Sequence, residues 1–154
     1  MLSGATPARF PLKVMNLTIR TYSELQHYDT LEERFDYLAL GGQVGEMTFG
    51  SERWINQRFY HSSEWHDVRS YVISRDLGFD LGAMDWPIRG KVLVHHMNPI
   101  TLEDIEEGTK NLLDPEYLVS VSHRLHNAIH YGDRSQVPTV WTPRTPGDTA
   151  LWRA

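Results

Sequence analysis

Hydrophobic side chains recur at helical spacing in five segments of the chain and form short continuous runs in two others. The helical segments begin at Ser, Thr or Asp residues that cap helices, and several end close to a glycine. The apolar runs at 89–95 and 118–121 are rich in Val and Leu and predict two strands. Together these elements predict one α+β domain. The predicted helices cover residues 30–40, 51–60, 62–77, 101–110 and 122–131.

The same pattern divides the 154 residues into three parts. Residues 1–28 hold an apolar segment interrupted by Pro11 and are predicted to form an arm or a strand. Residues 29–133 contain the predicted domain, with its core motif at 62–133. Residues 134–154 are rich in Pro, Thr and Arg without periodicity, which predicts a tail that is partly disordered.

The charge balance bears on nucleic acids as partners. The formal net charge is −5, which lowers the expected affinity for phosphate-rich ligands. Twelve of the fifteen cations are arginines, however, and arginine suits bidentate contact with phosphate. DNA therefore stays among the candidate partners.

Two absences narrow the classes of function. The sequence contains no cysteine, which excludes disulfides, cysteine-based zinc sites and cysteine nucleophiles. No apolar stretch approaches the roughly 20 residues that span a bilayer, and residues 1–9 lack the apolar run of a secretory signal. We therefore expect an intracellular protein with no membrane partner.

Five of the eight histidines fall in two short segments, one at the end of the first predicted strand and one in the last predicted helix. His126 and His130 stand four apart in that helix, so both imidazoles project from one face. His95 can supply a third metal ligand from the strand and leave open positions for water and phosphate oxygens. Because neighbours on a strand alternate faces, His96 is then free for proton transfer. This arrangement suits metal-dependent phosphodiester hydrolysis with neutral His96 as the general base.

Each histidine pair alone is more often structural, as a solvated helix face or a hydrogen-bonded pair at a strand end. Their occurrence together, in the order strand, strand, helix, favours a functional site. We expect the histidines outside this pattern, His27, His61 and His66, at the surface or in structural roles. His123 is expected beside the site or in solvent.

Three motifs follow one another in the second half of the chain: W-x-x-x-R-x-x-x-x-x-R-D at 65–76, V-H-H-M-N-P-I at 94–100 and H-N-A-I-H-Y-G-D at 126–133. In this order they resemble the HNH endonucleases of the His-Me finger (ββα-metal) group, above all its small phage-encoded members. The likeness continues upstream through T-F-G at 48–50 and N-Q-R-F-Y at 56–60, so it covers most of the chain except its two ends. The resemblance implies a ββα-metal HNH core with additional N-terminal helices.

The resemblance also assigns roles to individual residues. His95, His126 and His130 take the positions of the metal ligands, and His96 takes that of the general base that activates water. The ion implied is one divalent cation, Mg²⁺, Mn²⁺, Ni²⁺ or Zn²⁺. Arg124, at the start of the ligand helix, is expected either to hold the scissile phosphate or to be a surface arginine.

The chain departs from the family pattern at one catalytic position. Tyr117 stands before the second strand, where the family has an Asn that braces the loop and orients the base. The Tyr117 hydroxyl, Asn98 and Asn111 are the alternatives for that role. The cysteine pairs that bind a structural zinc in many HNH proteins are also absent.

The resemblance implies an endonuclease that hydrolyses DNA phosphodiester bonds in the cytoplasm of a bacterial host, encoded by a phage. Phage terminase or other packaging proteins are further expected partners, and association with the virion stays open. The alternative is a phage structural or packaging-associated protein with the same fold and weak or no cleavage, which the acidic charge and Tyr117 favour. A third hypothesis is a metal-binding module without catalysis.

Overall fold

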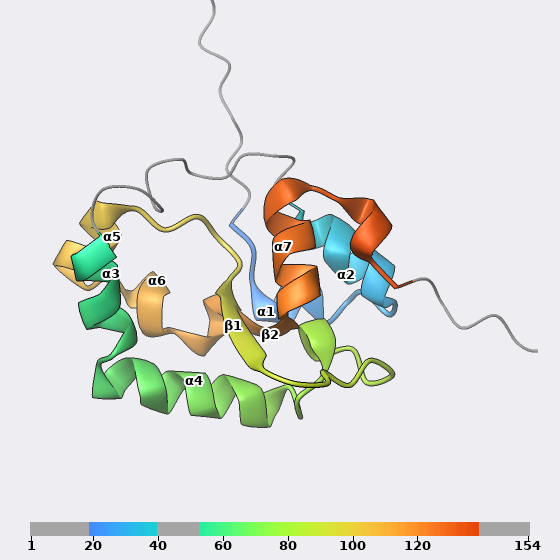
Figure 1. Ribbon diagram of the computed structural model, residues 1–154, viewed down its shortest axis with the longest axis horizontal. Coiled ribbons are helices and arrows are strands. Elements are labelled where there is room, and N and C mark those ends of the chain that lie inside the picture. The colour runs from blue at the N-terminus through green and yellow to red at the C-terminus, as the bar shows by residue number, and fades with distance from the viewer. Residues whose placement is uncertain (1–18, 40–52, 139–154) are drawn as a thin grey trace, which may run out of the picture.

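The computed structural model describes residues 19–39 and 53–138, which form several helices and a small antiparallel sheet (Figure 1). The chain is therefore α+β, as predicted. Among the described residues, none of the helices has the length and apolar character needed to cross a membrane. In chain order the elements are α1 (Tyr22–Leu25), α2 (Leu31–Leu38), α3 (Arg53–Tyr60), α4 (Ser63–Arg75), η1 (Asp80–Gly82), β1 (Val92–His96), α5 (Leu102–Glu107), α6 (Lys110–Leu113), η2 (Pro115–Tyr117), β2 (Leu118–Ser122), α7 (His123–Tyr131) and η3 (Arg134–Gln136).

The predicted helices and strands are confirmed to within a few residues, with two differences. The helix predicted over 101–110 ends at Gly108, whose left-handed backbone (φ +62°) separates α5 from α6. The segment predicted as an arm or a strand contains helix α1, whose Leu25 is fully buried in the core. Residues 1–18, the upstream motif at 48–50 and most of the predicted tail lie outside the described residues.

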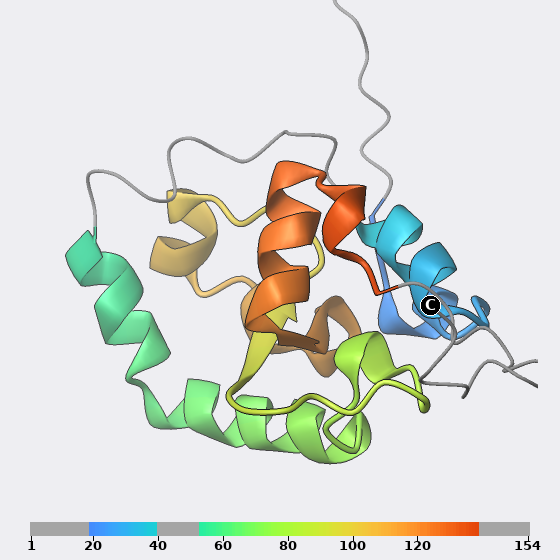
Figure 2. The same ribbon diagram turned by 45° about the vertical axis from the view of Figure 1, so that its right-hand side comes forward.

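Helices α4 and α7 enclose the sheet from its two faces (Figures 1 and 2). Strands β1 and β2 pair antiparallel, with Val92 opposite Ser122 and His96 opposite Leu118. Because side chains alternate along a strand, each strand contributes to both faces. Leu93, Val119 and Val121 join the core cluster that contains the buried residues of α7, and Val94 and Leu118 join the cluster of Trp65 and Val72 on α4. The same alternation places His95 on the α7 face and His96 on the α4 face.

Side chains from the end of α4 and from η1 form hydrogen bonds with the backbone groups along the outer edge of β2. The Ser120 N–H donates to Asp76 Oδ2 at 2.7 Å, and the Ser122 N–H donates to Asp80 Oδ1. Arg75 Nη2 donates to the Leu118 carbonyl at 2.7 Å, and the Arg75 Nε pairs with Asp76 Oδ1 at 2.8 Å. Buried backbone polar groups need such partners, so these three side chains take the place of a third strand.

Candidate metal centre

Helix α7 starts where β2 ends, and its two boundaries follow directly from the sequence. The Ser122 side chain accepts a hydrogen bond from the Leu125 N–H and caps the helix, and Gly132 ends it with φ +67°. The helix buries Leu125, Ala128 and Ile129 against the sheet. His126 and His130 each follow one residue after a buried position and are half-buried, so they lie along the flank of the apolar stripe.

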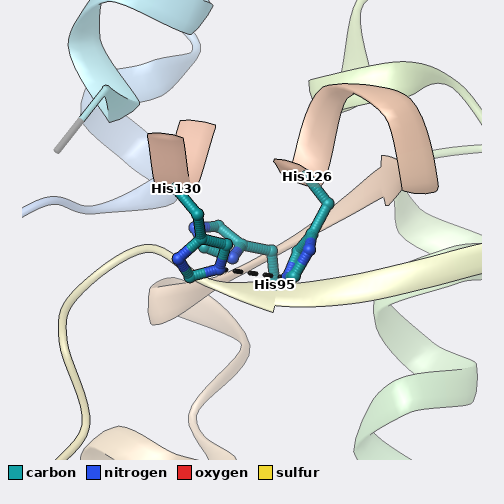
Figure 3. Close-up of side chains that lie close together, drawn as sticks. All are labelled: His95, His126 and His130. Carbon is teal, nitrogen blue, oxygen red and sulfur yellow. Dashed lines mark hydrogen bonds between the residues drawn. The ribbon is translucent and has the colours of Figure 1, made fainter. Parts of the chain in front are cut away.

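The three predicted ligands converge, His95 from β1 and the other two from α7 (Figure 3). One imidazole nitrogen from each of the three histidines lies within 4.8 Å of the corresponding nitrogens of the other two. The Nε2 atoms of His126 and His130 are 3.1 Å apart, and the His95 ring lies edge-on to both, with centroid distances of 5.2 and 5.0 Å. Three histidines are thus close enough together to bind one metal ion.

The chemistry of this cluster fits a divalent cation. His95 is 3% exposed, and its Nε2 is buried without a hydrogen-bond partner among the described residues. Leaving a buried polar atom unsatisfied is costly, and a bound cation would accept its lone pair. Three neutral imidazoles suit a borderline-soft cation such as Zn²⁺ or Ni²⁺ and leave positions for other oxygen ligands.

The cluster also keeps its histidines in the neutral form that metals require. Burial, and then the neighbouring His126 and His130, hold the pKa of His95 well below its usual value. Burial is also the first cause that lowers the pKa of His126 to about 4, with His130 next. Each neutral imidazole therefore keeps one nitrogen lone pair at neutral pH.

His96 lies on the opposite face of the sheet, outside this cluster. Its ring stacks on Trp65 of α4, with 5.2 Å between centroids and 16° between planes. Its Nε2 lies 3.0 Å from the Leu112 carbonyl oxygen, which can only accept, so Nε2 carries the hydrogen. The neutral ring then has Nδ1 as its proton acceptor. Burial lowers the pKa of His96 to about 4, against a smaller opposite effect of the Leu112 hydrogen bond.

The group that orients His96 is the backbone carbonyl of Leu112. None of the three side chains expected for this role, those of Tyr117, Asn98 and Asn111, takes it. Tyr117 contributes its carbonyl to the Met97 N–H at 2.9 Å, and its hydroxyl makes no hydrogen bond with a described residue. The Asn98 side chain binds the backbone of Arg20 instead, and Asn111 is exposed. All of these positions line a cavity of about 30 Å³ beside His96, with room for about one water molecule.

Arg124 does not share the face of the two helix ligands. With about 100° of rotation per residue, it lies roughly 160° around α7 from His126. Its side chain is exposed, and it makes no ion pair with a described residue. Arg124 is thus an exposed arginine at the helix start, on a different face of α7 from His126, and its contact with a phosphate stays a prediction.

The other histidines are where the sequence suggested. His27, His61 and His66 are exposed, and His123 is exposed with its Nδ1 3.5 Å from the Asn127 amide nitrogen. One residue near the cluster had no sequence signal. Arg20, from the segment predicted as an arm or a strand, forms two hydrogen bonds with the side chain of Asn98, 78 positions along the chain. Its charge also helps to lower the pKa of His95, after burial and the neighbouring histidines.

Comparison of the chain with protein-family models, with curated proteins and with solved structures finds no match.

Proposed function

We propose that this protein is a metal-dependent endonuclease of the HNH type that hydrolyses DNA phosphodiester bonds. In this proposal β1, β2 and α7 form the ββα-metal core, and His95, His126 and His130 hold one divalent cation, Mg²⁺, Mn²⁺, Ni²⁺ or Zn²⁺. The observation that carries it is the convergence of these three histidines from a strand and a helix. The resemblance of the surrounding motifs to HNH endonucleases then supplies the reaction class.

The chain's residues divide the chemistry between the two faces of the sheet. A divalent cation bound by the cluster would supply charge stabilisation at the phosphate and at the leaving oxygen. His96 Nδ1 accepts the proton of the attacking water, because Nε2 is already committed to the Leu112 carbonyl. That hydrogen bond and the stacking on Trp65 fix the orientation of the ring.

The placement of these side chains restricts where the substrate binds. His95 and His96 leave β1 on opposite faces, so a phosphodiester in reach of both lies across the end of that strand. The cavity lined by His96, Asn98 and Tyr117 opens at this end of β1. We assign it to the water that His96 activates.

A second candidate function is a phage structural or packaging-associated protein that binds metal and has weak or no cleavage. Its partners would be terminase or other packaging proteins, in the bacterial cytoplasm or in the virion. The burial of His96 against Trp65 favours this candidate, because a base so enclosed is harder for solvent and DNA to reach. The net charge of −5 favours it as well.

Plasmid nicking separates the two candidates. The wild-type protein is incubated with supercoiled plasmid and Mg²⁺, Mn²⁺ or Ni²⁺, with a chelator as the blank and His66→Ala, an exposed histidine, as the matched control. The endonuclease proposal predicts metal-dependent nicking by both proteins. If the wild-type protein binds metal but nicks the plasmid with none of the three ions, the result favours the non-cleaving alternative.

A further inference from the structure

Three aromatic side chains gather around His96 on the α4 face of the sheet. Trp65 of α4 stacks on the His96 ring with 5.2 Å between centroids, and the Phe59 ring of α3 lies 6.3 Å from it. The ring of Tyr60, the last residue of α3, lies 5.1 Å from those of Phe59 and Trp65. A single aromatic ring therefore separates Tyr60 from the proposed general base. Phe59 and Tyr60 end the N-Q-R-F-Y motif, to which the proposed reaction assigns no role.

These aromatic side chains differ in their exposure to solvent. Trp65 is 5% exposed and Phe59 is half-buried, whereas Tyr60 is 41% exposed. The planes of the Tyr60 and Phe59 rings are 71° apart, and those of Tyr60 and Trp65 are 82° apart. Neither neighbour stacks parallel to the Tyr60 ring, so the two contacts hold it in place and leave part of it open to solvent. A held, exposed ring of this kind can stack on a planar ligand.

The kind of ligand follows from the place of Tyr60 beside the candidate site. In the proposed function the scissile phosphate lies at the end of β1, within reach of His96. The planar group expected nearest to Tyr60 is then the base of an adjoining nucleotide. Every base has a π-face, and aromatic side chains bind unpaired bases by stacking on it. Bases inside a duplex already stack on one another, so an exposed ring favours unpaired bases.

The charge of the chain also favours contacts with bases over contacts with phosphates. Grip on a duplex backbone depends on cations, and the formal net charge is −5. The two arginines of α4 are engaged within the protein. Arg69 Nη2 donates to the Val92 carbonyl at 2.8 Å, and Arg75 binds Asp76 and two backbone carbonyls. Stacking needs no cation, so it can contribute affinity on this face of the protein.

We propose that Tyr60 stacks on an unpaired nucleobase next to the scissile phosphate, so that the substrate is single-stranded or locally unpaired DNA. The inference rests on the proposed function, and it names the substrate class and a residue that selects it. Tyr60 binds substrate and takes no part in proton transfer at His96. Stacking uses the π-face, so the ring of Tyr60 is required and its hydroxyl is not.

The test compares DNA binding by variants of this ring. Fluorescence anisotropy measures the affinity for a labelled oligothymidylate strand and for a duplex of the same length, in chelator so that no strand is cut. Wild type should bind the single strand more tightly than the duplex. Tyr60→Ala should weaken single-strand binding roughly 5-fold to 100-fold, the effect of losing one stacked base, while Tyr60→Phe should bind as wild type does. Tyr71→Ala removes a 56% exposed tyrosine of α4 and is the matched control, which should change neither affinity.

Crosslinking of the wild-type protein keeps the test independent of how a variant folds. Under ultraviolet light, a strand that carries 5-iodouracil should crosslink to Tyr60, because the iodinated base reacts with an aromatic side chain stacked on it. Mass spectrometry of the peptides identifies the residue.

Four results would overturn the assignment and leave the endonuclease proposal standing. They are no single-strand binding by wild type, a preference of wild type for duplex, equal single-strand affinity in wild type and Tyr60→Ala, and crosslinks only to other residues. Weakened binding by Tyr60→Ala, together with no metal-dependent cutting of either DNA by wild type, would instead support the stacking and overturn the proposed function.

Discussion

The two faces of the sheet treat neighbouring histidines in opposite ways. On the α7 face, His95 is buried with its Nε2 unpartnered among the described residues and with two other imidazoles beside it. On the α4 face, His96 stands apart from them, with one nitrogen bound to the Leu112 carbonyl and its ring against Trp65. A metal ligand needs an uncommitted lone pair, whereas a general base needs one nitrogen fixed and the other open. In the proposed function, one strand provides both the metal ligand and the general base, because its side chains alternate between the two faces.

The outer edge of β2 forms hydrogen bonds with side chains from the end of α4. Asp76 has a fully buried side chain, pairs with Arg75 and accepts the Ser120 N–H. Asp76→Ala should destabilise the protein by about 3–5 kcal/mol, since removing one partner of a buried ion pair leaves an uncompensated charge. Urea denaturation measures the change, and Asp67→Ala, on the exposed side of α4, is the control. A loss no greater than that of the control would show that the edge does not need this carboxylate.

The α7 face should respond to metal, and the α4 face should not. Divalent metal at 100 times its dissociation constant should stabilise the fold by about 2.7 kcal/mol. His126→Ala and His130→Ala should abolish most of this gain, because each removes a ligand, while His123→Ala on the same helix keeps it. Thermal melts with Ni²⁺ or chelator test the comparison. Equal metal stabilisation in all three variants would contradict the ligand assignment.

The α4 face should respond to acid through His96. Its pKa is about 4 in the folded protein and near 6.5 when unfolded, so the unfolded chain binds the proton first as the pH falls. Stability present above pH 6.5 should therefore decrease between about pH 6.5 and pH 4, by on the order of 2–3 kcal/mol from this residue. Denaturation in chelator at several pH values should show a shallower decrease for His96→Gln than for wild type. Parallel profiles would mean that His96 does not titrate in this window.

The smallest effect on nicking is expected from removing the Tyr117 hydroxyl, because a backbone carbonyl orients His96. Its hydroxyl makes no hydrogen bond with a described residue, and the Leu112 carbonyl orients His96. Tyr117→Phe should nick plasmid at close to the wild-type rate. A loss comparable with that of a His96 variant would instead place the hydroxyl in the catalytic machinery.

Local patterns predicted the elements that carry the site. The apolar runs located β1 and β2, the Ser122 cap and Gly132 bounded α7, and the spacing of His126 and His130 put both on one face. Strand alternation also predicted that the side chains of His95 and His96 lie on opposite faces of the sheet. Each of these features depends on residues that are close together in the chain, so it can be recognised from the sequence alone.

The contacts that position the site were not predictable in the same way. The Leu112 carbonyl that braces His96 is a backbone group, and any residue type can supply it. The hydrogen bonds between Arg20 and Asn98 join positions 78 apart in the chain, and no residue pattern indicates such a pair. The angle around α7 between Arg124 and His126 could have been derived from the sequence, and it would have favoured the surface role.

The most direct test compares His96→Ala with His95→Ala in paired measurements of plasmid nicking and Ni²⁺ affinity. His96→Ala should lower the nicking rate by roughly 10²- to 10⁴-fold, the typical contribution of a general base, and leave the Ni²⁺ affinity near that of wild type. His95→Ala should lose both metal and activity. Nicking by His96→Ala at the wild-type rate, or loss of metal together with activity in that variant, would contradict the division of roles between the two faces.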